Sequence, residues 1–233
     1  MQLLLGSPPQ AEPAKCVWAY PLAGAVVGGL AGSVLWAARA LGLPLVIGAA
    51  WALVVSVLLT GGLHEDGLAD AADGWGGGNS PSSTLEIMRD SRIGSYGAIA
   101  LVLSFSIRGA AVASLRQPEA AFAALTASGA LGRGAMIGLL CLLRPARADG
   151  LGATLAPIRP VACFVGLALA AASAMTLGPS RSILGVIAAA TATLVVAALA
   201  WRRIGGYTGD ILGATEQATE CVVLTVAASF GTM

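Results

Sequence analysis

The residues best suited to chemistry lie in one acidic segment that directly follows an apolar stretch. The segment reads Gly61-Gly-Leu-His-Glu-Asp-Gly-Leu-Ala-Asp-Ala-Ala-Asp-Gly74 and holds four of the twelve acidic residues of the chain. In a helix, Asp66, Asp70 and Asp73 stand at i, i+4 and i+7 and therefore share one face. Carboxylates grouped in this way repel one another, and a divalent cation relieves the repulsion. Because hard oxygen ligands suit such ions, the spacing predicts a Mg²⁺ site, with Mn²⁺ as an alternative.

Two neighbours of this face have more than one interpretation. Glu65 points about 100° away from Asp66 in a helix, so it is either a further ligand or an exposed side chain. His64, the only histidine, is a general base, a phosphate contact or a structural hydrogen-bond partner. A solvated helix end would explain one carboxylate, whereas three on one face favour a functional site. The candidate catalytic residues are Asp66, Asp70, Asp73 and His64, and the candidate metal ligands are Glu65, Asp66, Asp70 and Asp73.

Polar residues further along the chain are candidates for binding phosphate. Arg89 and Arg92 stand at i and i+3 on either side of Asp90 and could clamp phosphates through bidentate contacts, or they could lie on a surface helix at a membrane interface. Arg147 and Asp210 belong to glycine-rich loops, whose backbone N–H groups can also face phosphates. The candidate phosphate-binding or substrate-binding residues are Arg89, Asp90, Arg92, Arg133, Arg147 and Asp210.

Two arginines, Arg108 and Arg133, fall inside apolar segments. A charge in the middle of a membrane costs at least about 2.5–3.5 kcal/mol, so each of them must meet an anion. Glu216 and Glu220, at i and i+4 in the last apolar segment, could provide it. A phosphate of a substrate is the other possibility, and the sequence leaves both open.

The composition places these residues in a membrane protein. Of the 233 residues, 57% are hydrophobic and 11% are charged, whereas soluble domains carry about 25% charged residues. A membrane-spanning helix needs about 20 mostly apolar residues. The sequence therefore predicts an all-α, polytopic transmembrane bundle of six to seven spans, forming one integral membrane domain over residues 1–233. The expected spans are 17–38, 43–63, 96–115, 119–143, 160–178, 182–201 and the more polar 207–230.

The basic residues predict how the bundle is oriented. With seven spans, one face carries eight basic residues and the opposite face carries Arg39, Arg116 and Arg181. By the positive-inside rule the first face is cytoplasmic. The polar loops 64–95, 144–159 and 202–213 then share that face and could build one site. The eight residues are Lys15, Arg89, Arg92, Arg144, Arg147, Arg159, Arg202 and Arg203.

Other features of the sequence exclude several classes of protein. The net charge of +1 gives no reason to expect a nucleic-acid partner. The four cysteines, Cys16, Cys141, Cys163 and Cys221, are scattered and predict neither a disulfide framework nor a zinc site. Residues 1–14 have neither a basic start nor a long apolar core, so no cleavable signal peptide is expected.

Four segments of the chain, in this order, resemble the cobalamin synthase family, whose members are also called adenosylcobinamide-GDP ribazoletransferases. The resemblance extends from about Tyr20 to the end of the chain. The Thr-Arg-Leu-Pro-like stretch that usually precedes the first span of the family is absent from residues 1–15. The four segments are Gly62–Gly74, Leu85–Gly97, Arg144–Gly152 and Gly205–Ala214.

The resemblance implies a Mg²⁺-dependent transfer in the bacterial inner membrane, among membrane lipids. The positive-inside rule predicts that its site lies on the cytoplasmic side. In this reaction the 3′-hydroxyl of α-ribazole, or of α-ribazole 5′-phosphate, attacks the cobinamide-linked phosphorus of adenosylcobinamide-GDP. GMP leaves, and the product is adenosylcobalamin or its 5′-phosphate. The metal ligands of such a site would be Asp66, Asp70 and Asp73, with arginines neutralising the remaining charge.

Two alternative functions fit the sequence less well. A CDP-alcohol phosphotransferase of lipid synthesis is expected to carry an Asp-Gly-x-x-Ala-Arg run, but here Ala69 and Asp70 follow Gly67 and Leu68. An ion-coupled transporter is expected to spread its charges along the spans near the membrane midplane. The clustering of the acidic residues in one segment disfavours it.

Overall fold

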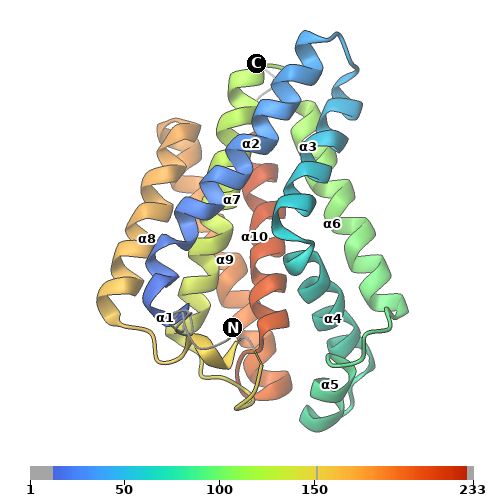
Figure 1. Ribbon diagram of the computed structural model, residues 1–233, viewed down its shortest axis with the longest axis vertical. Helices are drawn as coiled ribbons and strands as arrows, with labels where there is room; N and C mark the ends of the chain where they lie inside the picture. The colour runs from blue at the N-terminus through green and yellow to red at the C-terminus, as the bar shows by residue number, and fades with distance from the viewer. Residues whose placement is uncertain (1–12, 151, 230–233) are drawn as a thin grey trace, which may run out of the picture.

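Apolar segments separated by short polar loops form a bundle of long helices (Figure 1). The computed structural model describes residues 13–150 and 152–229. The predictions for residues 1–15 therefore fall largely outside the described residues. The predicted all-α transmembrane bundle is confirmed. The α-helices are α1 Pro13–Cys16, α2 Tyr20–Ala40, α3 Leu45–Thr60, α4 Leu63–Gly77, α5 Pro81–Ile87, α6 Ser95–Ser114, α7 Pro118–Leu142, α8 Pro160–Ala174, α9 Pro179–Ile204 and α10 Gly209–Ser229; the 3₁₀ turns are η1 Val17–Ala19, η2 Ala153–Leu155 and η3 Met175–Leu177.

Most of the expected spans correspond to observed helices. Within the described residues, five helical stretches are long and apolar enough to cross a membrane, and a bent pair of helices raises the number to six. The expected span 207–230 forms α10, which is not among them. This helix lies in the middle of the bundle (Figure 1) and packs against α4, α6, α7 and α9. Because its neighbours cover it, α10 can carry polar residues that a lipid-facing helix could not.

The bent pair is α3 and α4, which meet at 90°. The break is made by Gly61 and Gly62, whose φ angles of 65° and 71° lie in the left-handed region that favours glycine. The expected span 43–63 therefore ends early, at Thr60, and the acidic segment begins a separate helix. The sequence left open whether that segment is helical, and α4 shows that it is.

Glycines allow α2 and α7 to lie in backbone contact, as membrane helices often do. A Cβ atom on Gly28 would collide with the carbonyl oxygen of Leu125, whereas a Cβ on Gly29 would lie 3.6 Å from the ring of Phe122. We expect Gly28→Ala to lower the free energy of unfolding by about 1–3 kcal/mol through overpacking. The matched variant Gly29→Ala makes the same chemical change one residue away.

Thermal unfolding of both variants in lipid nanodiscs measures the difference. Gly29→Ala should unfold at or slightly above the wild-type temperature, because alanine favours the helix. Equal unfolding temperatures for the two variants would contradict the close approach of α2 and α7.

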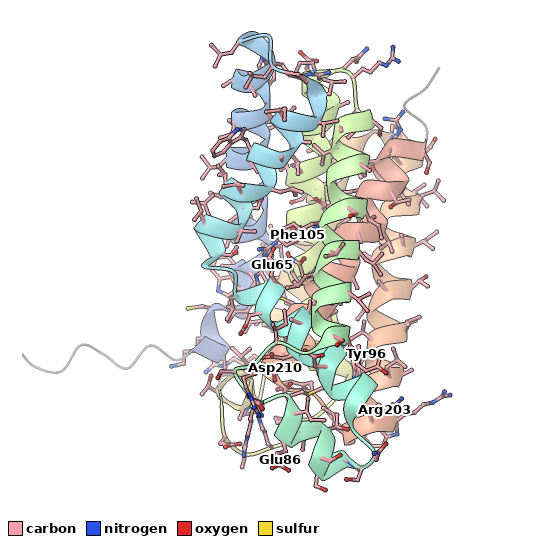
Figure 2. All side chains as sticks on the ribbon, turned by 90° about the vertical axis from the view of Figure 1, so that its right-hand side faces the viewer. Glu65, Glu86, Tyr96, Phe105, Arg203 and Asp210 are labelled. Atoms are coloured by element: carbon pink, nitrogen blue, oxygen red, sulfur yellow. A yellow bond between two sulfur atoms is a disulfide. The ribbon has the colours of Figure 1, made fainter. Side chains whose placement is uncertain are left out.

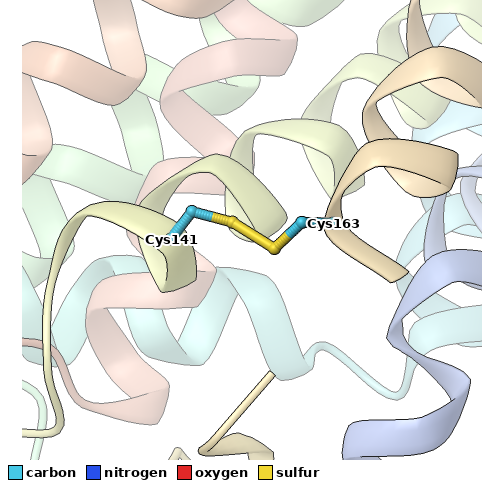
Figure 3. Close-up of a disulfide and its surroundings, with 2 residues drawn as sticks. All are labelled: Cys141 and Cys163. Carbon is cyan, nitrogen blue, oxygen red and sulfur yellow. A yellow bond between two sulfur atoms is a disulfide. The ribbon is translucent and has the colours of Figure 1, made fainter. Parts of the chain in front are cut away.

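The cysteines depart from the expectation that none of them pairs. Cys141, near the end of α7, forms a disulfide with Cys163, near the start of α8 (Figure 3). The expectation of no disulfide is therefore wrong for these two. The two cysteines are 22 residues apart and belong to no recognisable sequence motif. The antiparallel packing of α7 and α8 brings them together. Cys16 and Cys221 are free.

Candidate active site

The crossing of α4 and α10 assembles the site, and two glycines allow it. A Cβ atom on Gly67 would lie 2.9 Å from the carbonyl oxygen of Asp210 and 3.2 Å from the Cα atom of Gly213. Side chains at either position would force the helices apart. The contact brings Asp66 of α4 to the first turn of α10, where Asp210 lies close enough for the two carboxylates to repel each other. Residues far apart in the sequence thus form one acidic centre.

Beside this crossing lies a cavity of about 600 Å³. Residues from α2, α3, α4, α7 and α10 and from the loop before α8 line it. Five of the predicted site residues reach it together, and the rest of its wall is mainly apolar. Figure 2 shows Glu65 deeper in the bundle than Asp210, which lies near the level where the loops begin. The five predicted residues are His64, Asp66, Arg133, Arg147 and Asp210.

Three polar loops meet next to the cavity, as the sequence predicted. The backbone N–H of Tyr207 donates to the carbonyl of Arg144 (2.9 Å), and the N–H of Ala146 donates to the carbonyl of Tyr207 (2.8 Å). The third loop joins through an ion pair of 2.6 Å between Arg89 and Asp149. These loops lie side by side in the lower part of Figure 1 and form one loop face.

Arg147 links this surface to the acidic centre. Its guanidinium lies 3.5 Å from the Asp210 carboxylate and 4.0 Å from that of Asp149. Its Nη1 atom is buried and has no hydrogen-bond partner among the described residues. Asp149 was not among the predicted site residues, although it bridges Arg89 and Arg147. One indication of this role was present in the sequence, because Asp149 lies two residues after Arg147 in a glycine-rich loop.

The predicted face of three aspartates is only partly open. Asp73 accepts hydrogen bonds from the backbone N–H groups of Gly94 (2.7 Å) and Gly97 (2.9 Å). It therefore caps the start of α6, where a carboxylate is favoured by the helix dipole. The carboxylates of Asp66, Asp210 and Asp73 repel the negative charge of Asp70. Together with Asp66, Asp70 lines a second hollow on the other side of α4.

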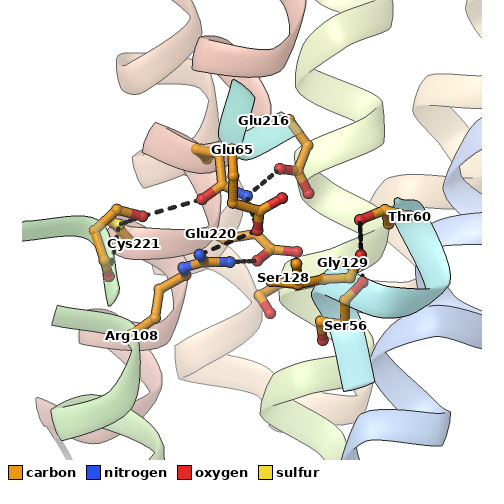
Figure 4. A network of polar contacts seen from close by, with 12 residues as sticks. Ser56, Thr60, Glu65, Arg108, Ser128, Gly129, Glu216, Glu220 and Cys221 are labelled. Carbon is orange, nitrogen blue, oxygen red and sulfur yellow. Dashed lines mark hydrogen bonds and ion pairs between the residues drawn. The ribbon is translucent and has the colours of Figure 1, made fainter. Parts of the chain in front are cut away.

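Glu65 belongs to a buried network of charges that joins α4, α6, α7 and α10 (Figure 4). Its Oε1 atom accepts from Arg108 (3.2 Å) and from the side chain of Gln217 (3.1 Å). Arg108 also donates to Glu220 at 3.0 Å. Arg133 pairs with both Glu216 and Glu220. Of the two partners that the sequence left open for the buried arginines, the structure provides the carboxylates.

The predicted phosphate clamp around Asp90 does not reach the cavity. Arg92 donates to Asp90 at 2.6 Å on the exposed surface, and these hydrogen bonds lower the pKa of Asp90 to about 2. Arg89 is held by Asp149 instead. The described wall of the cavity includes none of the three residues. Their part in binding phosphate stays a prediction.

The metal site also stays a prediction. Among residues 13–150 and 152–229, no group of three His, Cys, Asp or Glu side chains lies close enough together to hold a metal ion without moving. Asp66, Asp70 and Asp210 are nevertheless near one another. No hydrogen bond or ion pair to the side-chain carboxylates of Asp66 and Asp70 is found in the described part of the chain, so these oxygens remain available.

Comparison with known proteins identifies the family. The family described as cobalamin-5-phosphate synthase matches residues 5–228. The chain belongs to this family. The resemblance carried by the four sequence segments is thus confirmed, and cobalamin synthesis is favoured over the two alternative functions.

Relatives of the chain in this family cover nearly its whole length. It is similar to the adenosylcobinamide-GDP ribazoletransferase of Bradyrhizobium diazoefficiens, with 46% identity over 93% of this chain and 84% of the relative. It is also similar to proteins of the same name from Mesorhizobium japonicum, with 44% identity over 92% and 83% of the two chains, and from Azorhizobium caulinodans, with 45% identity over 90% and 82%. No solved structure matches the chain.

Proposed function

We propose that this chain is a membrane-bound adenosylcobinamide-GDP ribazoletransferase. It joins adenosylcobinamide-GDP to α-ribazole, or to α-ribazole 5′-phosphate, and releases GMP. The observation that carries the proposal is the match of the cobalamin synthase family to residues 5–228, together with relatives of that name. The cavity supports it, because carboxylates and arginines meet there beside an apolar wall.

The residues of the cavity suit a transfer at phosphorus, which depends on positioning and charge neutralisation more than on a strong base. In the proposed step, a ribose hydroxyl of α-ribazole bonds to the cobinamide-linked phosphorus. The bond from that phosphorus to the bridging oxygen breaks, and GMP leaves with the bonding electrons. The hydroxyl proton passes to His64 or to a carboxylate, both of which line the cavity. Arg147 faces the negative charge of the diphosphate.

We further propose that Asp66, Asp70 and Asp210 hold Mg²⁺, for which Mn²⁺ can substitute. Bound there, the cation would neutralise the diphosphate and make its phosphorus more reactive. The chemistry of these side chains fits, because hard carboxylate oxygens are the ligands that such ions prefer. Glu65 and Asp73 were also expected to be ligands. Each of them is engaged in hydrogen bonds, so we assign them to positioning.

The proposed location is the bacterial inner membrane, with the loop face in the cytoplasm, as the positive-inside rule favours. Single cysteines introduced at Glu86 of α5 and at Gln117, between α6 and α7, test this in a background without native cysteines. A membrane-impermeant maleimide should label the cysteine at Gln117 in spheroplasts and the one at Glu86 only after lysis. The reverse labelling would contradict this orientation.

Release of GMP tests the proposed activity. Protein purified into lipid nanodiscs is incubated with adenosylcobinamide-GDP and α-ribazole, with Mg²⁺ or with EDTA. We expect GMP only when both substrates and the metal are present. GMP release that is unaffected by EDTA would contradict the metal proposal, and no GMP under any condition would overturn the proposed function.

A further inference from the structure

We propose that the 600 Å³ cavity is the pocket for the nucleoside substrate, α-ribazole, and that the corrinoid binds outside it. This inference rests on the proposed function, which names two substrates but does not say where each of them lies. The pocket would take the flat base into its apolar part and hold the ribose at its charged part. Only the diphosphate of the corrinoid substrate would then reach Asp66.

The size of the cavity favours the smaller substrate. Pockets that enclose drug-sized ligands measure about 300–1,000 Å³, and a nucleoside is a ligand of this size. Adenosylcobinamide-GDP carries a corrin macrocycle, an adenosyl group and a guanosine diphosphate, and it is several times larger than a nucleoside. At about 600 Å³ the cavity can enclose α-ribazole but not the whole corrinoid.

The lining of the cavity has a charged part and an apolar part. Asp66, Arg147 and Asp210 mark the charged part, near the crossing of α4 and α10. The wall from α2 and α3 is formed by Tyr20, Ala23, Val27, Leu59 and Thr60. Arg133 also lines the cavity and packs against Gly24 of α2, but its charge is neutralised by Glu216 and Glu220. The base of α-ribazole is a dimethylbenzimidazole, an apolar bicyclic ring, and its ribose carries the hydroxyl groups. The apolar base therefore suits the wall from α2 and α3, and the ribose suits the charged part of the lining.

Guanosine, the other nucleoside of the reaction, fits this wall poorly. The edge of guanine carries several hydrogen-bond donors and acceptors, and burying them without partners is costly. The hydroxyl of Thr60 already donates to carbonyl groups of its own helix, at Ser56 and Val57. On the described part of the wall this leaves the Tyr20 hydroxyl as the one available polar side-chain group. Burying the dimethylbenzimidazole ring does not incur this cost.

Adjacent residues on α2 provide a matched test. Val27 is half-buried and lines the cavity, whereas Val26 is 61% exposed on the outer face of the same helix. Val27→Trp should fill the apolar part and raise the KM for α-ribazole by about tenfold or more, with the KM for adenosylcobinamide-GDP within about twofold of the wild-type value. Val26→Trp should leave both values unchanged. Equilibrium dialysis with α-ribazole alone should show the same loss of affinity for Val27→Trp.

A second pair of variants, on α3, keeps the inference testable if a variant of the first pair fails to fold. Leu59 lines the cavity, and Leu58 is 73% exposed. Leu59→Trp and Leu58→Trp should repeat the pattern of the α2 pair. An increase in the KM for adenosylcobinamide-GDP alone, an equal increase for both substrates, or unchanged values in active variants would overturn the inference. Release of GMP by the wild-type protein tests the proposed function separately, since the dialysis requires no turnover.

Discussion

Asp66→Asn is expected to lower the rate of GMP release by about a thousandfold, the loss typical when one group that stabilises the transition state is removed. Asp66 lines both the main cavity and the hollow on the other side of α4, and it lies beside Asp210. Asparagine keeps the size of the side chain but removes the charge that would hold the metal. The rate is measured with saturating substrates and Mg²⁺ in lipid nanodiscs.

The control for this prediction is Glu86→Gln, which removes one carboxylate charge from an exposed position on α5. It should leave the rate and the unfolding temperature unchanged. Asp66→Asn should also insert and unfold normally, because no hydrogen bond to the Asp66 carboxylate is present in the described chain. If Asp66→Asn turned over at the wild-type rate, the assignment of Asp66 to the reacting centre would be wrong.

Arg108→Leu is expected to lower the free energy of unfolding by about 3–5 kcal/mol, the cost of breaking a buried ion pair from one side. The Arg108 side chain is 1% exposed and donates to both Glu65 and Glu220. It also lies 5.0 Å from the ring centre of Phe105. Its removal leaves carboxylates without their counter-charge in the middle of the bundle. Unfolding in mixed detergent micelles with increasing SDS measures the change.

Two comparisons show whether the charge network is responsible. Arg92→Leu, which removes an exposed arginine, should leave the stability within about 0.5 kcal/mol of the wild-type value. Adding Glu220→Leu to Arg108→Leu should recover part of the loss, because an apolar pair can replace a buried ion pair. A loss for Arg108→Leu as small as that for Arg92→Leu would contradict the structural role of the network.

The helices could be predicted from the sequence because each apolar segment is recognisable by its own length and composition. The boundaries of α6, α7 and α9 lie within three residues of the expected ones. The expected span 43–63 runs three residues past the end of α3, because the left-handed conformation of Gly61 and Gly62 ends the helix there. The disulfide of Cys141 was missed because it depends on how two helices pack.

The site could be predicted only as far as single helices define it. A helix places Asp66, Asp70 and Asp73 on one face, but the start of α6 decides that Asp73 is capped by backbone N–H groups. Glu65 was expected to be either a ligand or exposed, and its bond to Arg108 comes from another helix. Likewise, the meeting of Asp66 with Asp210 depends on a helix crossing. Contacts of this kind arise from tertiary packing, which spacing within one segment does not encode.

Binding of Mn²⁺ shows whether carboxylates from α4 and α10 form one metal-dependent site. Electron paramagnetic resonance of protein in nanodiscs, titrated with Mn²⁺, reports the affinity without turnover. We expect Mg²⁺ to compete with Mn²⁺, and we expect Asp66→Asn and Asp210→Asn each to weaken binding by about tenfold or more, while Glu86→Gln does not. Unchanged Mn²⁺ affinity in both aspartate variants would contradict the proposed metal site.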